Sequence, residues 1–302
     1  MSNNELTNNG AAFPRLDAFI PPEMAAKAEE IGVKKATIGW RNTLMLAVLA
    51  GAFIALGAVF ATTVATGAGG VLPFGVTKLL VGLVFCLGLI LVVVAGAELF
   101  TGNNLIIMAW ADRRITTFQV LRNWALVYVG NFIGSILTVV LMFLSKQYTF
   151  GGGAVGLTAL NIAHGKTSLD FVQAIALGIM CNALVCLAVW LCFSARTTTD
   201  KILSIIFPIS AFVAAGFEHS VANMYFIPMG LFIKMFAPAS FWQAIGKSAA
   251  DYANLTWGNF FFANLLPVTI GNIIGGAVMV GLVYWFIYIR KPKVNPFVTS
   301  SK

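Results

Sequence analysis

Long apolar stretches without a single charged side chain make up almost half of the chain. They cover residues 42–77, 79–97, 123–145, 171–195 and 252–289. A helix needs about 20 mostly apolar residues to cross the hydrocarbon core of a bilayer, and each stretch is about that long or longer. The pattern predicts an all-α polytopic membrane protein with six transmembrane helices, at 43–64, 76–111, 118–144, 169–194, 201–236 and 259–289.

The polar parts of the pattern lie at the two ends. The first 40 residues are polar, and the text EMAAKAEEIGVKK at 23–35 predicts a short helix lying on the membrane surface. We therefore expect a cytoplasmic N-terminal segment at 1–40 and a cytoplasmic tail at 291–302. Two three-span units, at 41–145 and 146–290, are expected between them.

Charge is scarce and lies mainly at the ends of the predicted spans. Only 10% of the residues are charged, against about 25% in an average soluble domain. The net charge of +8 does not form a soluble basic patch, so no nucleic-acid partner is expected. Fourteen Lys and Arg residues fall on the side of the termini and five on the other side, and the positive-inside rule places both termini in the cytoplasm.

Two of the predicted spans are interrupted in the same way. Ala95-Gly96-Ala97-Glu98 corresponds to Ala215-Gly216-Phe217-Glu218 at an offset of 120 residues, and Asn103 corresponds to Asn223. The motif GNFIG at 130–134 also returns as GNIIG at 271–275. These matches predict a duplicated three-span unit. Two such units must be inverted relative to each other, and broken helices in corresponding positions point to a transport site.

Each break creates a new helix N-terminus near the middle of the membrane. Thr101 and Ser220 are expected to cap these half-helices. A helix N-terminus carries free N–H groups and partial positive charge, so the pair of breaks favours an anionic substrate. The surrounding irregular backbone also requires an enclosing protein or a water-filled cavity.

Apart from Asp170 at the very start of the fourth span, Glu98 and Glu218 are the only carboxylates within the predicted spans. Because each repeat has one, we expect them to brace the broken backbone by accepting hydrogen bonds from its freed amides. A proton or cation site is the alternative. Glutamine retains an acceptor oxygen, so bracing predicts that a glutamine in either position is tolerated.

His219 breaks the symmetry, because the equivalent residue is Leu99. An ionisable side chain at this depth is a functional candidate, and histidine changes charge near neutral pH. We expect it to lie in the permeation path, whereas His164, in a predicted outside loop, is expected to be solvated. Asn182 and Asn272 either join helices or line the pore. The cysteines at 86, 181, 186 and 192 are interpreted as buried apolar residues.

Four segments carry a resemblance to a known family. They read PFGVTKLLVGLVFCLGLILVVVAGAELFTGN, NWALVYVGNFIG, AGFEHSVANMYFIPMG and LLPVTIGNIIGG. Together they resemble the formate/nitrite transporter family, above all its bacterial formate channels, over about residues 15–290. The resemblance implies an aquaporin-like fold, a homopentamer with one pore in each protomer, and a location in the bacterial inner membrane.

The resemblance also implies roles for single residues. Phe85 and Phe212 match the outer constriction of the family, and Leu89 and Leu99 match the inner one. Phe100 and Thr101 match the mobile loop in the second span. His219 matches a central histidine, with Asn182 and Asn272 beside it. The implied substrate is formate, which could cross the apolar rings as formic acid after taking a proton from His219, and no cofactor is implied.

Other functions remain open at this point. Nitrite or hydrosulfide could replace formate, and the sequence does not distinguish a passive channel from a proton-coupled carrier. A neutral-solute channel of the aquaporin type is disfavoured, because no Asn-Pro-Ala pair occurs at the breaks. An intramembrane enzyme is also disfavoured. Adjacent Glu218 and His219 point in different directions on a helix, and no catalytic Ser or Cys constellation accompanies them.

Overall fold

The computed structural model describes residues 17–290, and its regular elements are all helical. The α-helices are α1 Pro21–Thr37, α2 Trp40–Ala65, α3 Phe74–Ile90, α4 Ile107–Ala111, α5 Thr117–Leu144, α6 Ala154–Thr167, α7 Phe171–Ser194, α8 Thr198–Ala214, α9 Ser220–Phe236, α10 Ala239–Ile245, α11 Leu266–Ile273 and α12 Val283–Tyr288. π-Helical segments extend α3 at Leu91–Gly96 and flank α11 at Asn259–Leu265 and Ile274–Leu282. The predicted tail at 291–302 and the first 16 residues lie outside the described part.

Five helices of the described chain are long and apolar enough to cross a membrane. They are Trp40–Ala65, Phe74–Gly96, Thr117–Leu144, Phe171–Ser194 and Asn259–Tyr288. The predicted fifth span, 201–236, is divided into α8 and α9 by the residues 215–219. α9 and α10, which are bent by 112° at their junction, pass the same test as a pair and give a sixth candidate. The protein is therefore an all-helical membrane protein with five to six candidate spans.

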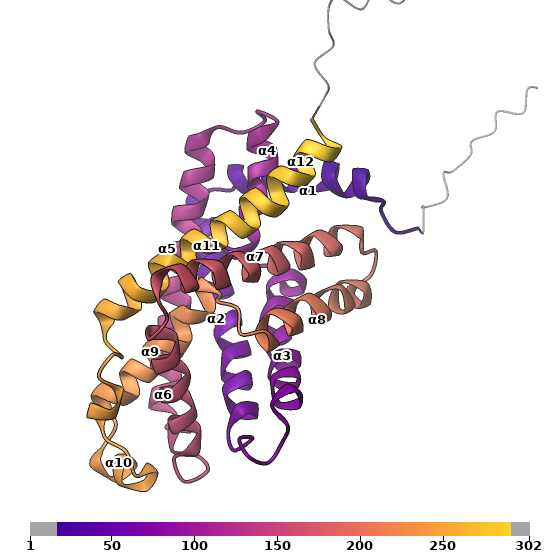
Figure 1. The fold of residues 1–302 in the computed structure, drawn as a ribbon. Coiled ribbons are helices and arrows are strands. Elements are labelled where there is room, and N and C mark those ends of the chain that lie inside the picture. Colours follow the sequence, from indigo (N-terminus) through magenta and orange to yellow (C-terminus); the bar gives the residue numbers. More distant parts are fainter. Residues whose placement is uncertain (1–16, 291–302) are drawn as a thin grey trace, which may run out of the picture.

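The two ends of the described chain lie at the same end of the molecule. In Figure 1, α1, α4 and α12 are grouped at the upper end, and α10 and the turn between α2 and α3 lie at the lower end. α1 contacts α12 directly, although about 250 residues separate them. This arrangement fits an even number of crossings.

The helix α1 does more than lie on a surface. Its face formed by Met24, Ala25, Ala28 and Gly32 is buried against α4, α7 and the 3₁₀ turn Gly102–Ile106. Glu29 on the same helix forms an ion pair with Arg114, at 3.2 Å between Oε1 and Nη1. Burial and the neighbouring Asp112 raise the pKa of the Glu29 carboxyl. The predicted helix is present, but it covers the second half of the broken span.

The segment predicted as an outside loop at 146–168 contains the helix α6. Three glycines with positive φ, Gly151, Gly152 and Gly153, lead into it, and Gly153 at φ 92° occupies the N-cap. His164 therefore lies on a helix, where it is half-buried and its ring is 5.7 Å from that of Tyr252 in an edge contact. The expectation of a solvated loop histidine was wrong, because the helix packs against α9.

Small residues let two pairs of helices approach closely. A Cβ atom added to Gly134 would overlap the carbonyl oxygen of Val48 between α5 and α2, and one added to Gly275 would overlap that of Ile179 on α7. Gly134 and Gly275 are the last residues of the repeated motifs GNFIG and GNIIG. The repeated motifs therefore mark close contacts between helices.

Substituting one of these glycines should prevent correct packing. Gly134→Ala places a methyl group inside the backbone of α2, so we expect the yield of folded, monodisperse protein to fall at least several-fold. Gly75→Ala, on the neighbouring span α3, is the matched control, because a Cβ atom added there meets nothing within 4 Å. Size-exclusion chromatography in detergent measures both. Equal yields from the two variants would contradict the close approach.

Candidate functional site: two cavities and the layer between them

The chain leaves its helical path at two places, 97–101 and 215–219. A glycine in the left-handed region lies at the start of each break: Gly96 has φ 84° and Gly216 has φ 75°. Only glycine adopts this conformation without strain. Each break then leads into a new helical segment, which begins at Gly102 in the first case and at Ser220 in the second.

Asn131 holds the backbone of the first break, and Asn272 holds the second. The amide oxygen of Asn131 accepts from the Phe100 N–H at 2.9 Å, and its nitrogen donates to the carbonyl of Glu98. The oxygen of Asn272 accepts from the Ser220 N–H at 2.9 Å, and its nitrogen donates to the carbonyl of Glu218. Buried backbone groups that lose their helical partner require such replacements.

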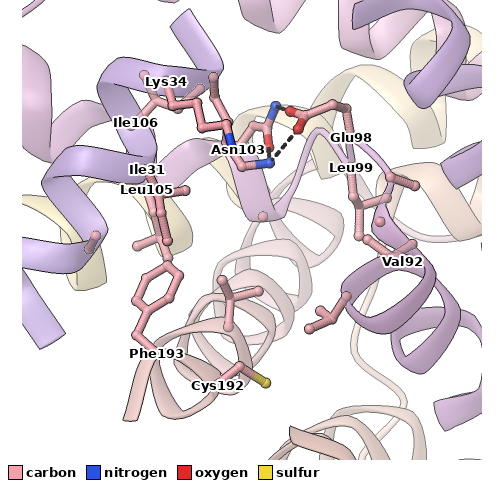
Figure 2. Close-up of a pocket in the computed structure, with 18 of the residues that line it drawn as sticks. Ile31, Lys34, Val92, Glu98, Leu99, Asn103, Leu105, Ile106, Cys192 and Phe193 are labelled. Atoms are coloured by element: carbon pink, nitrogen blue, oxygen red, sulfur yellow. Dashed lines mark hydrogen bonds and ion pairs between the residues drawn. The ribbon is translucent and has the colours of Figure 1, made fainter. Parts of the chain in front are cut away.

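The two glutamates bond to side chains and not to freed backbone amides. Glu98 accepts from the Lys35 ammonium at 2.7 Å and from the Asn103 amide at 2.6 Å. Figure 2 shows Asn103 directed at this carboxylate. Glu218 accepts from Lys166 at 2.7 Å and from Asn223 at 2.6 Å. The expectation that the glutamates accept hydrogen bonds from freed backbone amides was therefore wrong. Asn131 and Asn272 already bond the backbone groups at the two breaks.

Each glutamate forms a cluster with its lysine and asparagine partners, and a second asparagine belongs to each cluster. Asn123 accepts from Asn103 at 2.9 Å and donates to the carbonyl of Lys35. Asn264 accepts from Asn223 at 2.7 Å and donates to the carbonyl of Lys166. The same set of contacts therefore occurs twice, once around each glutamate.

Of the two expected caps, Ser220 is replaced by a histidine, and Thr101 holds the N-cap position of the Gly102–Ile106 turn without a side-chain capping bond. His219 occupies the N-cap of α9, and its Nδ1 accepts from the backbone N–H of Ala222 at 3.0 Å. Ser220 is the first helical residue and caps nothing. Thr101 makes no side-chain cap; its hydroxyl lies 2.9 Å from Nε2 of His219. Because Nδ1 accepts, the neutral imidazole carries its proton on Nε2 and donates it to Thr101.

One cavity, of about 500 Å³, opens beside the first break. In Figure 2, Ile31, Leu105 and Phe193 lie across it from Val92 and Leu99. Leu89 and Leu99 also line this cavity, and each is only 2% exposed. The two predicted inner-constriction residues thus lie together at the buried end of one cavity.

A second cavity, of about 340 Å³, lies beside the second break. Phe85, Phe212 and His219 line it, each 3% exposed. The two phenyl rings meet edge to face at 5.7 Å, and the imidazole stacks on Phe212 at 5.9 Å. Lys166 lines the same cavity. The predicted outer-constriction residues and the histidine are therefore brought together.

The two cavities share no lining residue. The layer between them contains Thr101, which is fully buried, together with its bond to His219. Two leucines bound this layer on one side, and two phenylalanines bound it on the other. The breaks therefore bring one polar pair into an otherwise apolar barrier.

Asn182 and Asn272 line neither cavity. Asn182 donates to the backbone carbonyls of Thr101, at 3.3 Å, and Asn272, at 2.7 Å. Both side chains are fully buried, and their contacts join helices to the breaks. Of the two functions left open for them, the contacts favour helix joining over pore lining.

The sequence interpretation missed the lysines and most of the asparagines of the clusters. Asn131 and Asn272 occupy equivalent positions in the two GN-I-G motifs, so the repeat itself could have identified Asn131. No comparable signal marks Lys35 or Lys166, which lie 63 and 52 residues from their glutamates. Within residues 17–290, no group of three or more metal-ligating side chains is present.

Comparisons with known proteins agree with this geometry. Residues 22–286 match the formate/nitrite transporter family. The chain is 49% identical over 275 residues to the formate channel FocA of Escherichia coli K12, covering 91% of this chain and 96% of that one. It is 45% identical over 265 residues to FocA of Haemophilus influenzae, covering 88% and 93%.

A solved structure described as a pentameric formate channel with formate bound is also similar. It superposes with a TM-score of 0.79 at 50% identity, covering 83% of this chain and 98% of that chain. The match in sequence extends across all the candidate spans, and the match in structure includes the whole of the neighbour's fold. The chain belongs to the formate/nitrite transporter family.

Proposed function

We propose that the protein is a channel for formate across the bacterial inner membrane and catalyses no reaction. The relatives described above are formate channels, and one of them is a pentamer with formate bound. The observation that carries the proposal is the Thr101–His219 pair, at 2.9 Å, in the layer between two cavities. It is a polar side-chain contact on a route bounded by Leu89, Leu99, Phe85 and Phe212.

Permeation through this layer follows from the hydrogen-bond pattern. With His219 neutral, the Thr101 hydroxyl accepts from Nε2, so its own proton is free to bond formate. Charging the imidazole puts a proton on Nδ1, and the bond from the Ala222 N–H must then break. A formate anion beside the ring favours that charged form, and sharing its proton gives formic acid, which can pass the apolar rings. We therefore propose proton-linked, pH-dependent flux.

The duplicated contacts support an inverted 3+3 repeat of the aquaporin type. The clusters of Lys35, Glu98, Asn103 and Asn123 and of Lys166, Glu218, Asn223 and Asn264 have the same connections in the same chain order. By this equivalence α1 corresponds to α6, so α1 belongs with the first repeat unit at 41–145. Glu98 and Glu218 brace the broken helices by fixing these lysines and asparagines.

Assembly and orientation complete the proposal. The chain forms a homopentamer in the lipid bilayer, and each protomer holds its own pore. The Lys and Arg distribution places the end with α1, α4 and α12 in the cytoplasm, so the cavity at Glu98 faces the cytoplasm and the cavity at His219 faces outward. Helix α1, from the N-terminal segment, lines the first cavity.

Flux in proteoliposomes tests the function. Vesicles containing the protein should release formate much faster than protein-free vesicles, without chemical change of the substrate. Nitrite and hydrosulfide are compared in the same assay, and a clearly faster flux of either would replace formate as the substrate. Chemical conversion of formate would contradict the transport function itself.

A labelling experiment tests the orientation. Cysteine introduced at Arg113 should react with an impermeant maleimide only in inside-out vesicles, and cysteine at Lys247 only in right-side-out vesicles. Both positions are exposed. The four native cysteines are buried and free, so they give little background. Labelling of position 113 from outside would overturn the proposed topology.

A further inference from the structure

The first cavity is lined by more positive side chains than negative ones. Four lysines line it, at positions 27, 34, 35 and 201, against a single carboxylate, Glu98. Lys35 is neutralised by Glu98 at 2.7 Å. Lys34 and Lys201 form no ion pair with any residue between 17 and 290.

These cations are held near each other by the fold. Lys27 and Lys34 are seven residues apart on α1, two turns along one face, and roughly 10 Å separates their backbone positions. Lys201 comes from the start of α8. The Lys27 ammonium donates to the carbonyl of Phe193 at 3.0 Å. Burial, together with Lys201 and Arg196, lowers the pKa of Lys27, so this group is already repelled by its neighbours.

Asp200, the residue next to Lys201 in the chain, has its carboxylate bonded to backbone groups and not to a lysine. The Asp200 carboxylate accepts from the backbone N–H groups of Arg196 and Thr197, at 3.1 and 2.9 Å, and so caps α8. It carries one charge, and Arg196 beside it carries the opposite one. Within residues 17–290, the lysines at 27, 34 and 201 have no carboxylate at ion-pair distance, although Glu23 and Glu30 lie one turn before Lys27 and Lys34 on α1.

The cavity is also large for formate, which has three heavy atoms. At about 500 Å³ it falls in the range of about 300–1,000 Å³ that holds whole small molecules. Its buried end is closed by Leu89 and Leu99, which a multiply charged anion cannot pass. A large anion drawn in by the lysines would stop above these leucines.

We propose that the lysines at 27, 34 and 201 form a binding site for a compact phosphate-bearing anion of charge −2 or more, which occupies the first cavity and blocks formate flux. Lysine is a good point-charge partner for phosphate, and three such groups match a multivalent ligand better than a monovalent one. The site lies on the side of α1, so the block is one-sided. This regulation rests on the proposed channel function and its orientation.

Inorganic pyrophosphate is the probe. Full-length protein is reconstituted, and formate flux is measured with pyrophosphate present only on the α1 side or only on the opposite side. We expect inhibition from the α1 side at submillimolar to millimolar concentration, weakening as sodium chloride is raised because screening reduces the attraction. Citrate in a parallel series distinguishes phosphate from carboxylate recognition, and equal potency of citrate would overturn the phosphate assignment.

Variants assign the site. In the double variant Lys34→Gln/Lys201→Gln, the half-inhibitory pyrophosphate concentration should rise at least tenfold, relative to that variant's own uninhibited flux. Lys34→Arg/Lys201→Arg should restore inhibition, and Lys247→Gln, at the other end of the molecule, should leave it unchanged. Calorimetric titration of pyrophosphate into the detergent-purified protein gives the same ranking without any flux.

The possible failures are distinct. Normal formate flux with no pyrophosphate effect, or equal inhibition from both sides, would overturn the inhibitory site and leave the channel function standing. Absence of formate flux in unliganded wild-type protein would instead overturn the channel function. Calorimetric binding that the double variant retains at full affinity would show that the anion sits elsewhere.

Discussion

The His219→Asn protein should carry formate at a rate that changes little between about pH 5 and pH 8, whereas the wild-type rate should vary strongly over that range. An unperturbed histidine titrates in that interval, but His219 is buried and its Nδ1 accepts from the Ala222 N–H, so its charged form depends on a formate anion arriving beside the ring. Asparagine is among the best N-cap residues, so it can still accept from the Ala222 N–H and preserve the start of α9. The substitution therefore removes the titration and retains the local fold.

The measurement is formate flux in proteoliposomes at several pH values, after the oligomer has been checked by size-exclusion chromatography. His164→Asn is the matched control, because this second histidine lies on α6 outside the layer between the cavities. Its pH profile should follow that of the wild type. If His219→Asn also kept the wild-type profile, the pH-sensitive element would have to be placed elsewhere, first in the N-terminal segment.

Glu218→Gln should destabilise the protein substantially, contrary to the tolerance expected from the sequence. All the groups bonded to this carboxylate are donors: Lys166, Asn223 and Asn264. A glutamine must turn its own NH₂ group toward at least one of them, and it leaves the Lys166 ammonium, whose side chain is 18% exposed, without its counter-charge. Removing one partner of a buried ion pair costs about 3 kcal/mol or more, which should appear in unfolding by dodecyl sulfate in mixed micelles.

Two further variants separate this cause from a general effect of charge. Glu30→Gln removes an exposed carboxylate on α1 and should change stability by no more than about 0.5 kcal/mol. Lys166→Gln/Glu218→Gln removes both charges and should recover part of the loss, since no unpaired ion remains. A Glu218→Gln protein as stable as wild type, but unable to carry formate, would indicate a proton-carrying role for Glu218.

Much of the fold follows directly from the sequence because a bilayer imposes simple rules. For the four unbroken spans, the uncharged stretches predicted helices that begin and end within about four residues of their observed limits; the third span, for example, was expected at 118–144 and is found at Thr117–Leu144. Glycine beside a glutamate marked both breaks correctly. Such local signals survive in the structure because the backbone of a membrane segment must satisfy its own hydrogen bonds.

Other features depend on contacts between distant residues and could not be read locally. The lysine partners of the glutamates lie on α1 and α6, which the sequence interpretation treated as a surface helix and a loop. The cap at α9 was assigned to Ser220 from residue preference, but His219 takes that position because its ring can also reach Thr101 across the layer. A tertiary contact thus decided between two neighbouring residues that local preference ranked the other way.

The side chain that holds the first break differs from the side chain that lines the cavity there, and this has a practical consequence for engineering. Asn131 holds this break through the backbone groups of Glu98 and Phe100, and the side chain of Leu99 between them takes no part in those bonds. Residue 99 can therefore be varied in size without dismantling the scaffold that positions it. We expect libraries at this single position to change which solutes pass while keeping expression and folding close to wild type.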